Sequence, residues 1–342
     1  MRRHTPVAAW LSPYVGWRTR QPLGLVGIRT LWAAVKRSHL VHIHGIWSPV
    51  GAIAALAAAC NQIPYVLTPH GMLQPWLLRR GRRRLKGIHL RTVGLRVLRG
   101  AAVVHCVTAS EASWVRRLTR GCVRTFVIPN PVPPDWPLGH AEQVLDAQRE
   151  RVVLFVGRLH PVKGLVSLLD AWVRVWPSHR EWRLLLVGHD QAGIWKELSR
   201  PLAAMDANQA VEFLGPRGRA ALVELYDSAA IFVLPSFTEV IGIANLEAAA
   251  RGVPILTSCR TGLDAVTEYE AGFVVRPTSA RIAEALAALM AMKDADRRGK
   301  GARALQMVWD RITWEKIAPA FEDLYGTALQ ERVRDVREPR AP

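Results

Sequence analysis

The sequence predicts an α/β protein built from two parallel-sheet domains that face a common cleft. Its 342 residues exceed one ordinary domain, and they suit two domains of roughly 150 residues each. Short apolar runs alternate with longer helical stretches along most of the chain, which is typical of repeated βαβ units. The alternation is interrupted once, where residues 129–137 hold five prolines, so the domain boundary is expected there.

Ten short apolar runs predict the strands, because a strand buried on both faces of a parallel sheet is continuously apolar. The four in the first half are Leu40–His44, Pro64–Thr68, Ala101–Thr108 and Arg124–Pro129. The six in the second half are Arg151–Val156, Arg183–Gly188, Val211–Gly215, Ala230–Pro235, Val253–Ser258 and Gly272–Val275.

Helical patterns lie between these runs and after the last one. They are Gly51–Asn61, Ser110–Arg120, Gly164–Trp176, Arg219–Ala229 and, after the last run, the amphipathic segment Thr313–Leu329. The predicted organisation is a first domain over 1–134, a linker over 135–150 and a second domain over 151–311, followed by a helix over 312–330 and a polar tail over 331–342.

Positive charge is concentrated in the first half. Residues 1–150 hold 21 Lys and Arg against 5 Asp and Glu, whereas the rest of the chain holds 25 against 23. Glu111 is the only acid within 1–134, and the densest basic run is Leu77–Gly87. Such a face attracts the phosphate of a nucleic acid, an anionic membrane or a phosphorylated substrate. A solvated arginine-rich helix is the alternative.

The cysteines and the apolar runs indicate the compartment. Cys60, Cys106, Cys122 and Cys259 show no Cys-x-x-Cys spacing, so we expect buried thiols in a reducing compartment and no metal site. The N-terminus lacks the apolar segment of a signal peptide. The longest apolar run, Val50–Cys60, is shorter than the ~20 residues that a spanning helix needs. A cytoplasmic location is therefore expected, either free or peripheral on the inner face of the plasma membrane.

The first strand of the second domain runs into a basic loop. Ligands of open parallel sheets bind beyond the carboxyl ends of the strands, and this strand is followed by Gly157, Arg158, Lys163 and Gly164. Glycine lets the backbone approach a ligand, and the two cations suit phosphate oxygens. Two exposed basic residues in an ordinary loop are the alternative.

A second loop joins the strand that ends at Pro235 to a helix that begins near Gly242 and Ile243. The unpaired N–H groups at a helix start suit a phosphate. Glu239 in the loop and Glu247 in the helix accept hydrogen bonds only. Glu247 therefore suits the paired hydroxyls of a ribose, and Glu239 suits those of a second sugar. Two acids flanking a cationic phosphate site indicate a nucleotide sugar.

Several of these stretches together resemble a known family. Residues 41–49, 68–76, 157–164 and 213–258 are similar to the retaining GT-B glycosyltransferases of family 4, the group 1 transferases. The resemblance implies two Rossmann-like domains in a GT-B fold. It also implies transfer of a sugar from a UDP- or GDP-sugar to an acceptor hydroxyl with retention, without a metal or other cofactor. Residues 1–38 contain no Gly-Gly loop of the kind the family has there. Either the first domain is truncated or this subgroup of the family differs.

The resemblance also implies which residues bind the donor. The residues matching Gly157, Arg158 and Lys163 hold the diphosphate, and the match to Glu247 holds the ribose. The match to Glu239 lies beside the donor sugar. No Asp-x-Asp pair lies near either loop, and fixed cations with a helix start can stabilise the leaving diphosphate in place of a metal.

Histidines of the first domain are the remaining polar candidates. The resemblance makes His70 the histidine that contacts the donor sugar near the reacting carbon, so His70 and Glu239 are the catalytic candidates. A neutral imidazole could also align the acceptor hydroxyl. His42 and His44 lie on one strand face, which would suit a metal, but no third ligand has a useful spacing. We expect His44 to line the acceptor site instead.

Trp76 and Arg79 stand at the start of the basic run. An interfacial aromatic side chain followed by arginines suits a polyprenyl-diphosphate-linked acceptor at an anionic membrane surface. Both are therefore expected on the acceptor side, with a free sugar as the other acceptor class. Packing of Trp76 within its own domain is an equal alternative.

Three function classes remain open. The first is an active transferase in exopolysaccharide, lipopolysaccharide or glycolipid assembly, and the second is a GT-B binding or regulatory subunit that has lost catalysis. The third is a basic nucleic-acid-binding protein, which would need aromatics interleaved with the basic residues. Only Trp76 lies near the basic run, so no nucleic-acid partner is expected.

Overall fold

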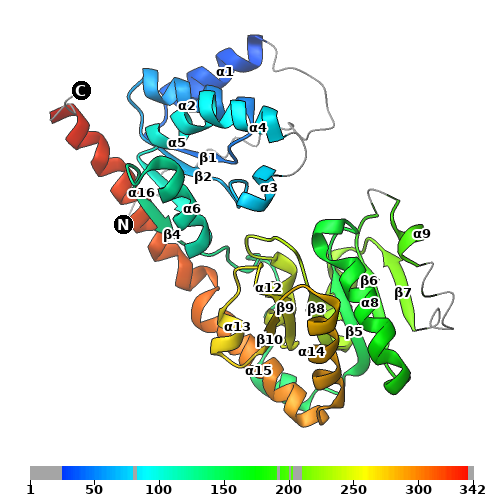
Figure 1. The fold of residues 1–342 in the computed structure, drawn as a ribbon. Coiled ribbons are helices and arrows are strands. Elements are labelled where there is room, and N and C mark those ends of the chain that lie inside the picture. Colours follow the sequence, from blue (N-terminus) through cyan, green and yellow to red (C-terminus); the bar gives the residue numbers. More distant parts are fainter. Residues whose placement is uncertain (1–24, 80–82, 191–192, 200–201, 203–209, 338–342) are drawn as a thin grey trace.

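Two parallel sheets divide the chain into two lobes (Figure 1). The computed structural model describes residues 25–79, 83–190, 193–199, 202 and 210–337. The first sheet has the strand order β1-β2-β3-β4 and the second β10-β9-β8-β5-β6-β7. All neighbouring strands within each sheet run parallel, which confirms the predicted fold class.

All ten predicted strands are confirmed to within a few residues at their ends. Those of the first sheet are β1 (Val41–His44), β2 (Tyr65–Thr68), β3 (Val103–Cys106) and β4 (Thr125–Val127). Those of the second sheet are β5 (Glu150–Val156), β6 (Arg183–Val187), β7 (Val211–Gly215), β8 (Ala229–Leu234), β9 (Ile255–Ser258) and β10 (Gly272–Val275).

The described helices connect and cover these strands. In the first lobe they are α1 (Leu25–Lys36), α2 (Pro49–Cys60), α3 (Pro75–Arg79), α4 (Arg83–His89), the π-helical η1 (Leu90–Gly94), α5 (Leu95–Gly100) and α6 (Ala109–Thr119). The second lobe has α7 (Ala141–Asp146), η2 (Pro161–Lys163), α8 (Leu165–Val175), η3 (Trp176–Ser178), α9 (Trp195–Leu198), α11 (Arg219–Ser228), α12 (Ile243–Ala250), α13 (Ala265–Glu268), α14 (Ser279–Ala291) and α15 (Asp294–Arg311). The last helix is α16 (Trp314–Arg337).

Two segments that lie outside the predicted strands and helices contain helix. The segment 135–150, predicted as a linker, contains the short helix α7, because Val144 is buried against the second lobe. The polar tail expected from residue 331 is helical as far as Arg337, as a continuation of α16. Residues 338–342 and the N-terminal residues 1–24, where the Gly-Gly loop was sought, lie outside the described residues.

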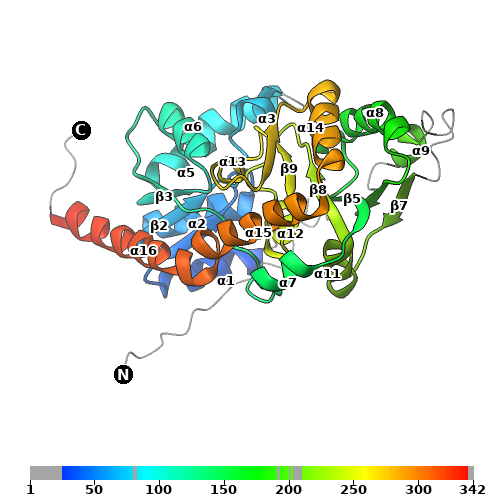
Figure 2. The same ribbon diagram turned by 90° about the horizontal axis from the view of Figure 1, so that it is seen from below.

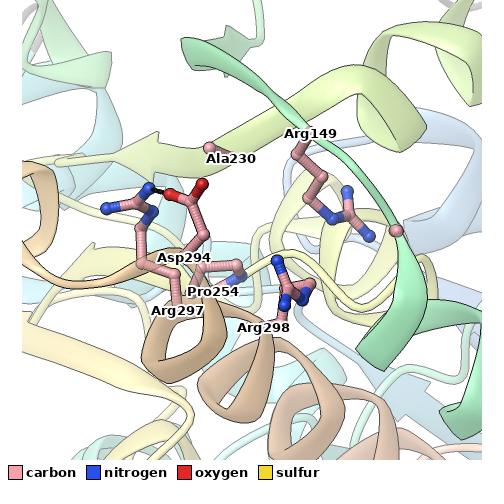
Figure 3. Close-up of a pocket in the computed structure, with 7 residues that line it drawn as sticks. Arg149, Ala230, Pro254, Asp294, Arg297 and Arg298 are labelled. Atoms are coloured by element: carbon pink, nitrogen blue, oxygen red, sulfur yellow. Dashed lines mark hydrogen bonds and ion pairs between the residues drawn. The ribbon is translucent and has the colours of Figure 1, made fainter.

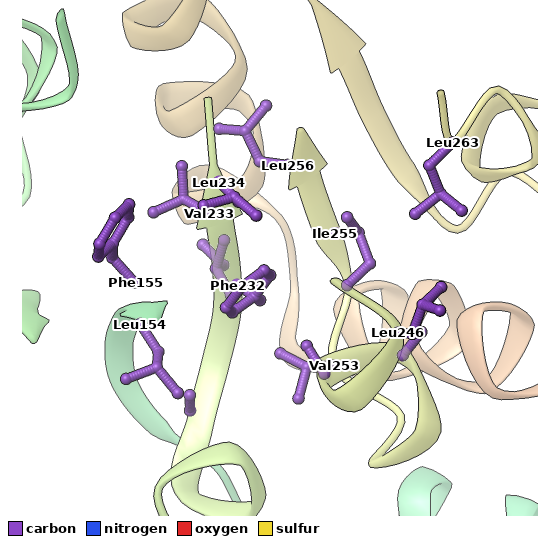
Figure 4. Packing of buried hydrophobic residues seen from close by; sticks show 14 of the residues in the cluster. Leu154, Phe155, Phe232, Val233, Leu234, Leu246, Val253, Ile255, Leu256 and Leu263 are labelled. Atoms are coloured by element: carbon purple, nitrogen blue, oxygen red, sulfur yellow. The ribbon is translucent and has the colours of Figure 1, made fainter. Parts of the chain in front are cut away.

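The core of the second lobe lies between β5, β8 and β9 and the helices that cover them. Phe155, Phe232, Leu246 and Ile255 are fully buried there (Figure 4). Burying each of these large apolar side chains contributes about 1.5–3 kcal/mol of transfer free energy. This contribution holds the sheet and α12 together. The carboxyl ends of these strands are therefore fixed in space.

The first sheet presents two faces to two different sets of helices. Side chains alternate along a strand, so Leu67 and Val104 pack with Leu98 of α5, whereas Val66 and Val103 lie on the other face. That second face belongs to the same buried cluster as Ile317, Leu324 and Ala328 of α16. Helix α16 therefore leaves the second lobe and covers a face of the first (Figure 2).

The two chain crossings between the lobes lie side by side. The backbone N–H of Val132, in the proline-rich segment, donates to the carbonyl oxygen of Ile312, just before α16, at 3.0 Å. None of the helices in the described ranges combines the length and apolar character that crossing a bilayer requires.

The expectation of four buried thiols is wrong. Cys106 is buried on β3, whereas Cys60, Cys122 and Cys259 are exposed, and all four are free thiols. Apolar neighbours in the sequence do not bury a residue at or beyond the end of a helix or strand: Cys60 ends α2, Cys259 follows β9, and Cys122 lies in the loop between α6 and β4.

Candidate functional site

Lys163 and Glu239 form an ion pair that joins the two loops predicted to carry the chemistry. Lys163 ends η2, the turn after β5, and Glu239 lies between β8 and α12. Because β5 and β8 pair in parallel, their carboxyl ends meet at one edge of the sheet. The two side chains are 14% and 21% exposed, so solvent screens their attraction less than at an open surface.

The backbones of the two loops also contact each other. The N–H of Phe237 donates to the carbonyl oxygen of Val162 at 2.8 Å. Gly164 has φ +74°, and a Cβ there would collide with the carbonyl oxygen of Pro235. Glycine is needed at this position because the two backbones approach too closely for a side chain.

The remaining predicted donor residues lie at the same edge. Arg158 is exposed just beyond β5, and Gly157 continues the strand by donating its N–H to the carbonyl oxygen of Val187 at 2.9 Å. Gly242 is the N-cap residue of α12, and Ile243, its first residue, is 38% exposed. The start of α12 therefore lies beside the loop that holds Glu239.

Glu247 has a partner that the sequence does not reveal. The hydroxyl of the fully buried Tyr226 on α11 donates to Glu247 Oε2 at 3.0 Å. Burial raises the pKa of Glu247, while the Tyr226 hydrogen bond lowers it. One carboxylate oxygen is thus fixed by the protein, and the other is available as an acceptor.

The loop after β2 brings the first lobe against Glu239. Gln74 Nε2 donates to the carbonyl oxygen of Glu239 at 2.9 Å. Gly71, with φ +72°, lies so close to Val240 that a Cβ would overlap the Val240 side chain. The residues around His70 and the residues around Glu239 therefore meet across the lobes.

Glu111, the only acid within residues 1–134, holds this loop in place. Its Oε1 accepts from the N–H of Gly71 at 2.5 Å and its Oε2 from the N–H of Val107 at 2.8 Å. The side chain is fully buried, and burial raises its pKa. The carboxylate joins the loops after β2 and β3, which positions His70.

The predicted histidines form a cluster at the carboxyl end of the first sheet. His44 Nδ1 lies 2.8 Å from His70 Nε2, and the rings of His42 and His44 stack with centroids 4.3 Å apart. His70 has φ +51°, an unusual backbone conformation for a residue other than glycine that often marks functional loops. His44 is thus a partner of His70.

Burial lowers the pKa of each histidine in this cluster. The pKa of His42 falls to about 3, and that of His70 to about 4, with repulsion from neighbouring histidines as the second cause. The pKa of His44 is also lowered by burial. Near neutral pH these imidazoles are therefore uncharged. Over the described part of the chain, no group of three His, Cys, Asp or Glu side chains is arranged to hold a metal ion.

A cavity of about 560 Å³ lies between the lobes beside Glu239. Its lining combines aromatic, hydroxyl and charged side chains: Trp76, Trp114, Thr108, Ser110, Thr238, Glu239, Arg260, Asp264, Arg276 and Thr278. Thr238 is 8% exposed, and its hydroxyl has no hydrogen-bond partner among the described residues. A cavity of this size and polarity suits a sugar-sized molecule.

The acceptor-side candidates do not all meet in that cavity. Trp76 lines it, so its side chain is not merely packed within its own lobe. Arg79 is exposed at the end of α3, and neither Arg79 nor His44 contributes to the cavity lining. His44 is instead bonded to His70, which is also absent from the cavity lining.

A second, much smaller hollow lies at the opposite edge of the second sheet. It has a volume of about 20 Å³ and is surrounded by Arg149, Arg297, Arg298 and Asp294, with Ala230 at the start of β8 (Figure 3). Asp294 is ion-paired with Arg297. This space holds about one water molecule, so it is not a substrate site.

Family comparisons agree with this geometry. Residues 140–304 match the family model described as "Glycosyl transferases group 1", and residues 2–131 match that of a "Glycosyl transferase 4-like domain". The chain belongs to the group 1 glycosyltransferases of family 4. The first match contains both loops of the Lys163–Glu239 pair, and the second contains the histidine cluster.

Curated relatives belong to the same family. The D-inositol 3-phosphate glycosyltransferase of Nocardia farcinica is 33% identical over 210 residues, which cover 58% of this chain and 45% of that protein. The protein of the same name from Acidothermus cellulolyticus is 35% identical over 192 residues, covering 53% and 42%. The chain thus spans less than half the length of these relatives.

Solved structures establish the fold as GT-B. HepE of Anabaena, crystallised with UDP and glucose, has a TM-score of 0.72 at 19% identity, covering 90% of this chain and 84% of that one. A sucrose-phosphate synthase of Thermosynechococcus elongatus has a TM-score of 0.69 at 23% identity, covering 89% and 77%.

Proposed function

We propose that this protein transfers a sugar from a nucleotide-diphospho-sugar to an acceptor hydroxyl, with retention and without a metal. The observation that carries the proposal is the contact of Lys163 with Glu239 at the start of α12. It puts a fixed cation, an acid and a helix N-terminus at one edge of a parallel sheet. This combination suits a diphosphate joined to a sugar.

In the proposed donor site, Arg158 and Lys163 bind the diphosphate together with the first N–H groups of α12. These groups are fixed before the reaction, so they can stabilise the charge that develops on the leaving diphosphate. Glu247, held by Tyr226, accepts from the ribose hydroxyls through its other oxygen. A diphosphate competes with Glu239 for Lys163, and the released carboxylate then accepts from hydroxyls of the donor sugar.

The proposed acceptor site is the cavity between the lobes. Trp76 and Trp114 offer aromatic surfaces for a sugar ring, and Thr238 offers an unpartnered hydroxyl. Arg260 and Arg276 also line this cavity, so an acceptor that carries a phosphate fits it. The matched relatives are named for inositol 3-phosphate, an acceptor with ring hydroxyls and a phosphate. We propose His70, which is uncharged near neutral pH and lies in the same loop as the cavity-lining Gln74, as the residue that aligns the reacting groups.

A lipid-linked acceptor is the second class that the surface supports. Leu85 and Ile88 of α4 are 59% and 60% exposed, and they lie among exposed arginines that include Arg84, Arg91 and Arg99. Apolar side chains within a cationic helical face suit the surface of an anionic membrane. We therefore propose a cytoplasmic protein that docks peripherally on the inner membrane face, where a polyprenyl-diphosphate-linked glycan would be accessible.

The experiment that tests this function uses purified full-length protein with UDP- and GDP-sugars. Calorimetry measures donor binding, and product analysis measures transfer to inositol phosphates and to polyprenyl-diphosphate glycans, with and without EDTA. Transfer that retains the anomeric configuration and persists in EDTA would support the proposal. Donor binding without transfer to any acceptor would instead favour the binding-subunit function, and no binding of any nucleotide sugar would exclude both.

A further inference from the structure

The histidine cluster continues away from the cleft as an unbroken chain of hydrogen bonds that ends on α16. The chain crosses three strands and consists of four links: Ile128 O to His105 Nε2 at 2.8 Å, His105 Nδ1 to Thr68 Oγ1 at 2.9 Å, Thr68 Oγ1 to His42 Nε2 at 2.7 Å, and His42 Nδ1 to the Tyr325 hydroxyl at 2.9 Å. Each polar atom in the chain thus lies within hydrogen-bonding distance of the next.

The carbonyl oxygen of Ile128, at one end of the chain, fixes which atom donates in every hydrogen bond of the chain. The Ile128 oxygen can only accept, so His105 Nε2 carries the proton, and Nδ1 of the neutral ring accepts from the Thr68 hydroxyl. Thr68 has no second proton, so it accepts from His42 Nε2–H. His42 Nδ1 must then accept from Tyr325. The chain therefore allows a single tautomer of His42 as long as the rings stay neutral, which their burial favours.

Helix α16 is packed to make the last link. His42, Thr68 and His105 share the sheet face that α16 covers, as strand alternation requires. The Phe321 ring lies 5.0 Å from that of His105, and the Tyr325 ring lies 5.7 Å from that of His42, both edge-on. Tyr325 thus comes from a part of the chain far from β1 in sequence.

The chain reaches the His44–His70 pair through His42. The His42 ring stacks on His44, and His44 is bonded to His70. The titratable groups around His42 are His44 on β1, His70 after β2, His105 on β3 and Tyr325 on α16. Burial is the largest cause that lowers the pKa of His42, and the neighbouring His44, His105 and His70 lower it further, so a charge on His42 is disfavoured.

We propose that Tyr325 is a positioning residue for the His44–His70 pair: by donating to His42 it completes the chain that keeps His42 uncharged and in one tautomer against His44. The kinetic consequence rests on the proposed transferase function, whereas the tautomer of His42 does not. Helix α16 would therefore both cover the first sheet and act, through His42, on the His44–His70 pair.

The first arm of the test is a nitrogen-15 spectrum of the histidine rings in the full-length protein. We expect wild-type His42 to carry its proton on Nε2. Tyr325→Phe removes one oxygen atom, and it should raise the pKa of His42 by about one, the effect of losing one hydrogen bond to the neutral form. Phe321→Leu is the control, because it changes the packing of α16 without removing a hydrogen bond, and it should leave the His42 signals unchanged.

The second arm is the pH dependence of transfer. Tyr325→Phe should move the acidic limb of kcat to higher pH, whereas Phe321→Leu should leave the limb in place. If Tyr325→Phe does not fold, Thr68→Val removes the acceptor of the His42 Nε2 proton, and the ring spectrum should then show that His42 no longer holds its proton on Nε2 alone. A His42 proton on Nδ1, or identical ring spectra for Tyr325→Phe and wild type, would overturn the proposal. If the ring spectra are as expected but the wild-type protein transfers no sugar, only the proposed function is overturned.

Discussion

Lys163 and Glu239 lie 76 residues apart in the chain and form an ion pair at the carboxyl ends of β5 and β8. The pair neutralises the cation that a diphosphate would need and the acid that a sugar hydroxyl would need. A bound donor therefore exchanges one partner for another, which limits the cost of leaving either group unpaired.

Replacing the two partners should have opposite effects on nucleotide binding. Lys163→Gln should weaken UDP or GDP binding by about 1.5–3 kcal/mol, the range for hydrogen bonds to charged groups. Glu239→Gln should not weaken it, because Lys163 loses its competitor, although transfer should fall. Calorimetry with the nucleotide measures both, with the exposed Lys316→Gln as control. Equal losses in both variants would contradict the exchange of partners.

Glu247→Ala should weaken nucleotide binding by about 1.5–3 kcal/mol, because the ribose hydroxyls lose a charged acceptor. Tyr226→Phe is the matched variant, since it frees one Glu247 oxygen without removing the carboxylate. It should lose less affinity than Glu247→Ala. The check is to measure the affinity of each variant for UDP and for uracil. If Glu247 contacts the ribose, the affinity for the free base should not change. Wild-type affinity for UDP in Glu247→Ala would rule that contact out.

Gly164→Ala should disrupt the donor loop more than Gly193→Ala does. Both glycines have positive φ, +74° and +64°, so each substitution costs roughly 1–2 kcal/mol of backbone strain. Only at Gly164 would the new Cβ meet the carbonyl oxygen of Pro235, and space is open around Gly193. Donor affinity should therefore fall in Gly164→Ala alone, while thermal unfolding shows a loss in both. Equal donor affinity in the two variants would show that the close approach is not needed.

Removing the exposed apolar side chains of α4 should reduce membrane binding. The double variant Leu85→Ser with Ile88→Ser should bind vesicles containing anionic lipid at least tenfold more weakly, since each buried CH₂ contributes about 0.8 kcal/mol. Leu56→Ser on α2 is the control, because Leu56 is 57% exposed but lies on another helix. Vesicle co-sedimentation measures the effect. Similar binding of the double variant and wild type would mean that α4 does not enter the bilayer surface.

Acid should destabilise the first lobe through its histidines. The folded-state pKa values of His42 and His70, about 3 and about 4, lie below the ordinary 6.5. Below pH 6.5 the unfolded chain binds more protons than the folded chain, so the free energy of unfolding falls as the pH falls toward 4. Denaturant unfolding between pH 8 and 4 measures this slope. His42→Gln should flatten it, whereas the exposed His140→Gln should not; equal slopes in both would place the effect elsewhere.

Most of the fold could be predicted because its signal is local. Each of the ten strands is an apolar run, and a parallel sheet buried on both faces needs such runs. The ends of the fold were harder to predict. Helix α16 continues past residue 331 and α7 forms within the expected linker, because packing against the rest of the protein decides such segments more than their own composition.

The sequence singles out the candidate site residues but not the contacts among them. Lys163, Glu239 and His70 stand out as polar residues after buried strands. Their partners do not: Tyr226 and Glu111 occur within ordinary helical patterns. His105 carried a usable signal, since it is a polar residue within an apolar run, but only the register of β1, β2 and β3 places it on the face of His42.

The sequence by itself determined two parallel-sheet domains, a basic first half and the positions of the two loops that we propose as the donor site. These follow from periodicity and residue type, which act over a few neighbouring residues. Only the tertiary structure decided that Lys163 pairs with Glu239, that Glu111 holds the loop of His70, and that Tyr325 completes the histidine chain. Such pairings depend on how two sheets and a crossing helix pack, and the distance between two residues in the sequence does not contain that information.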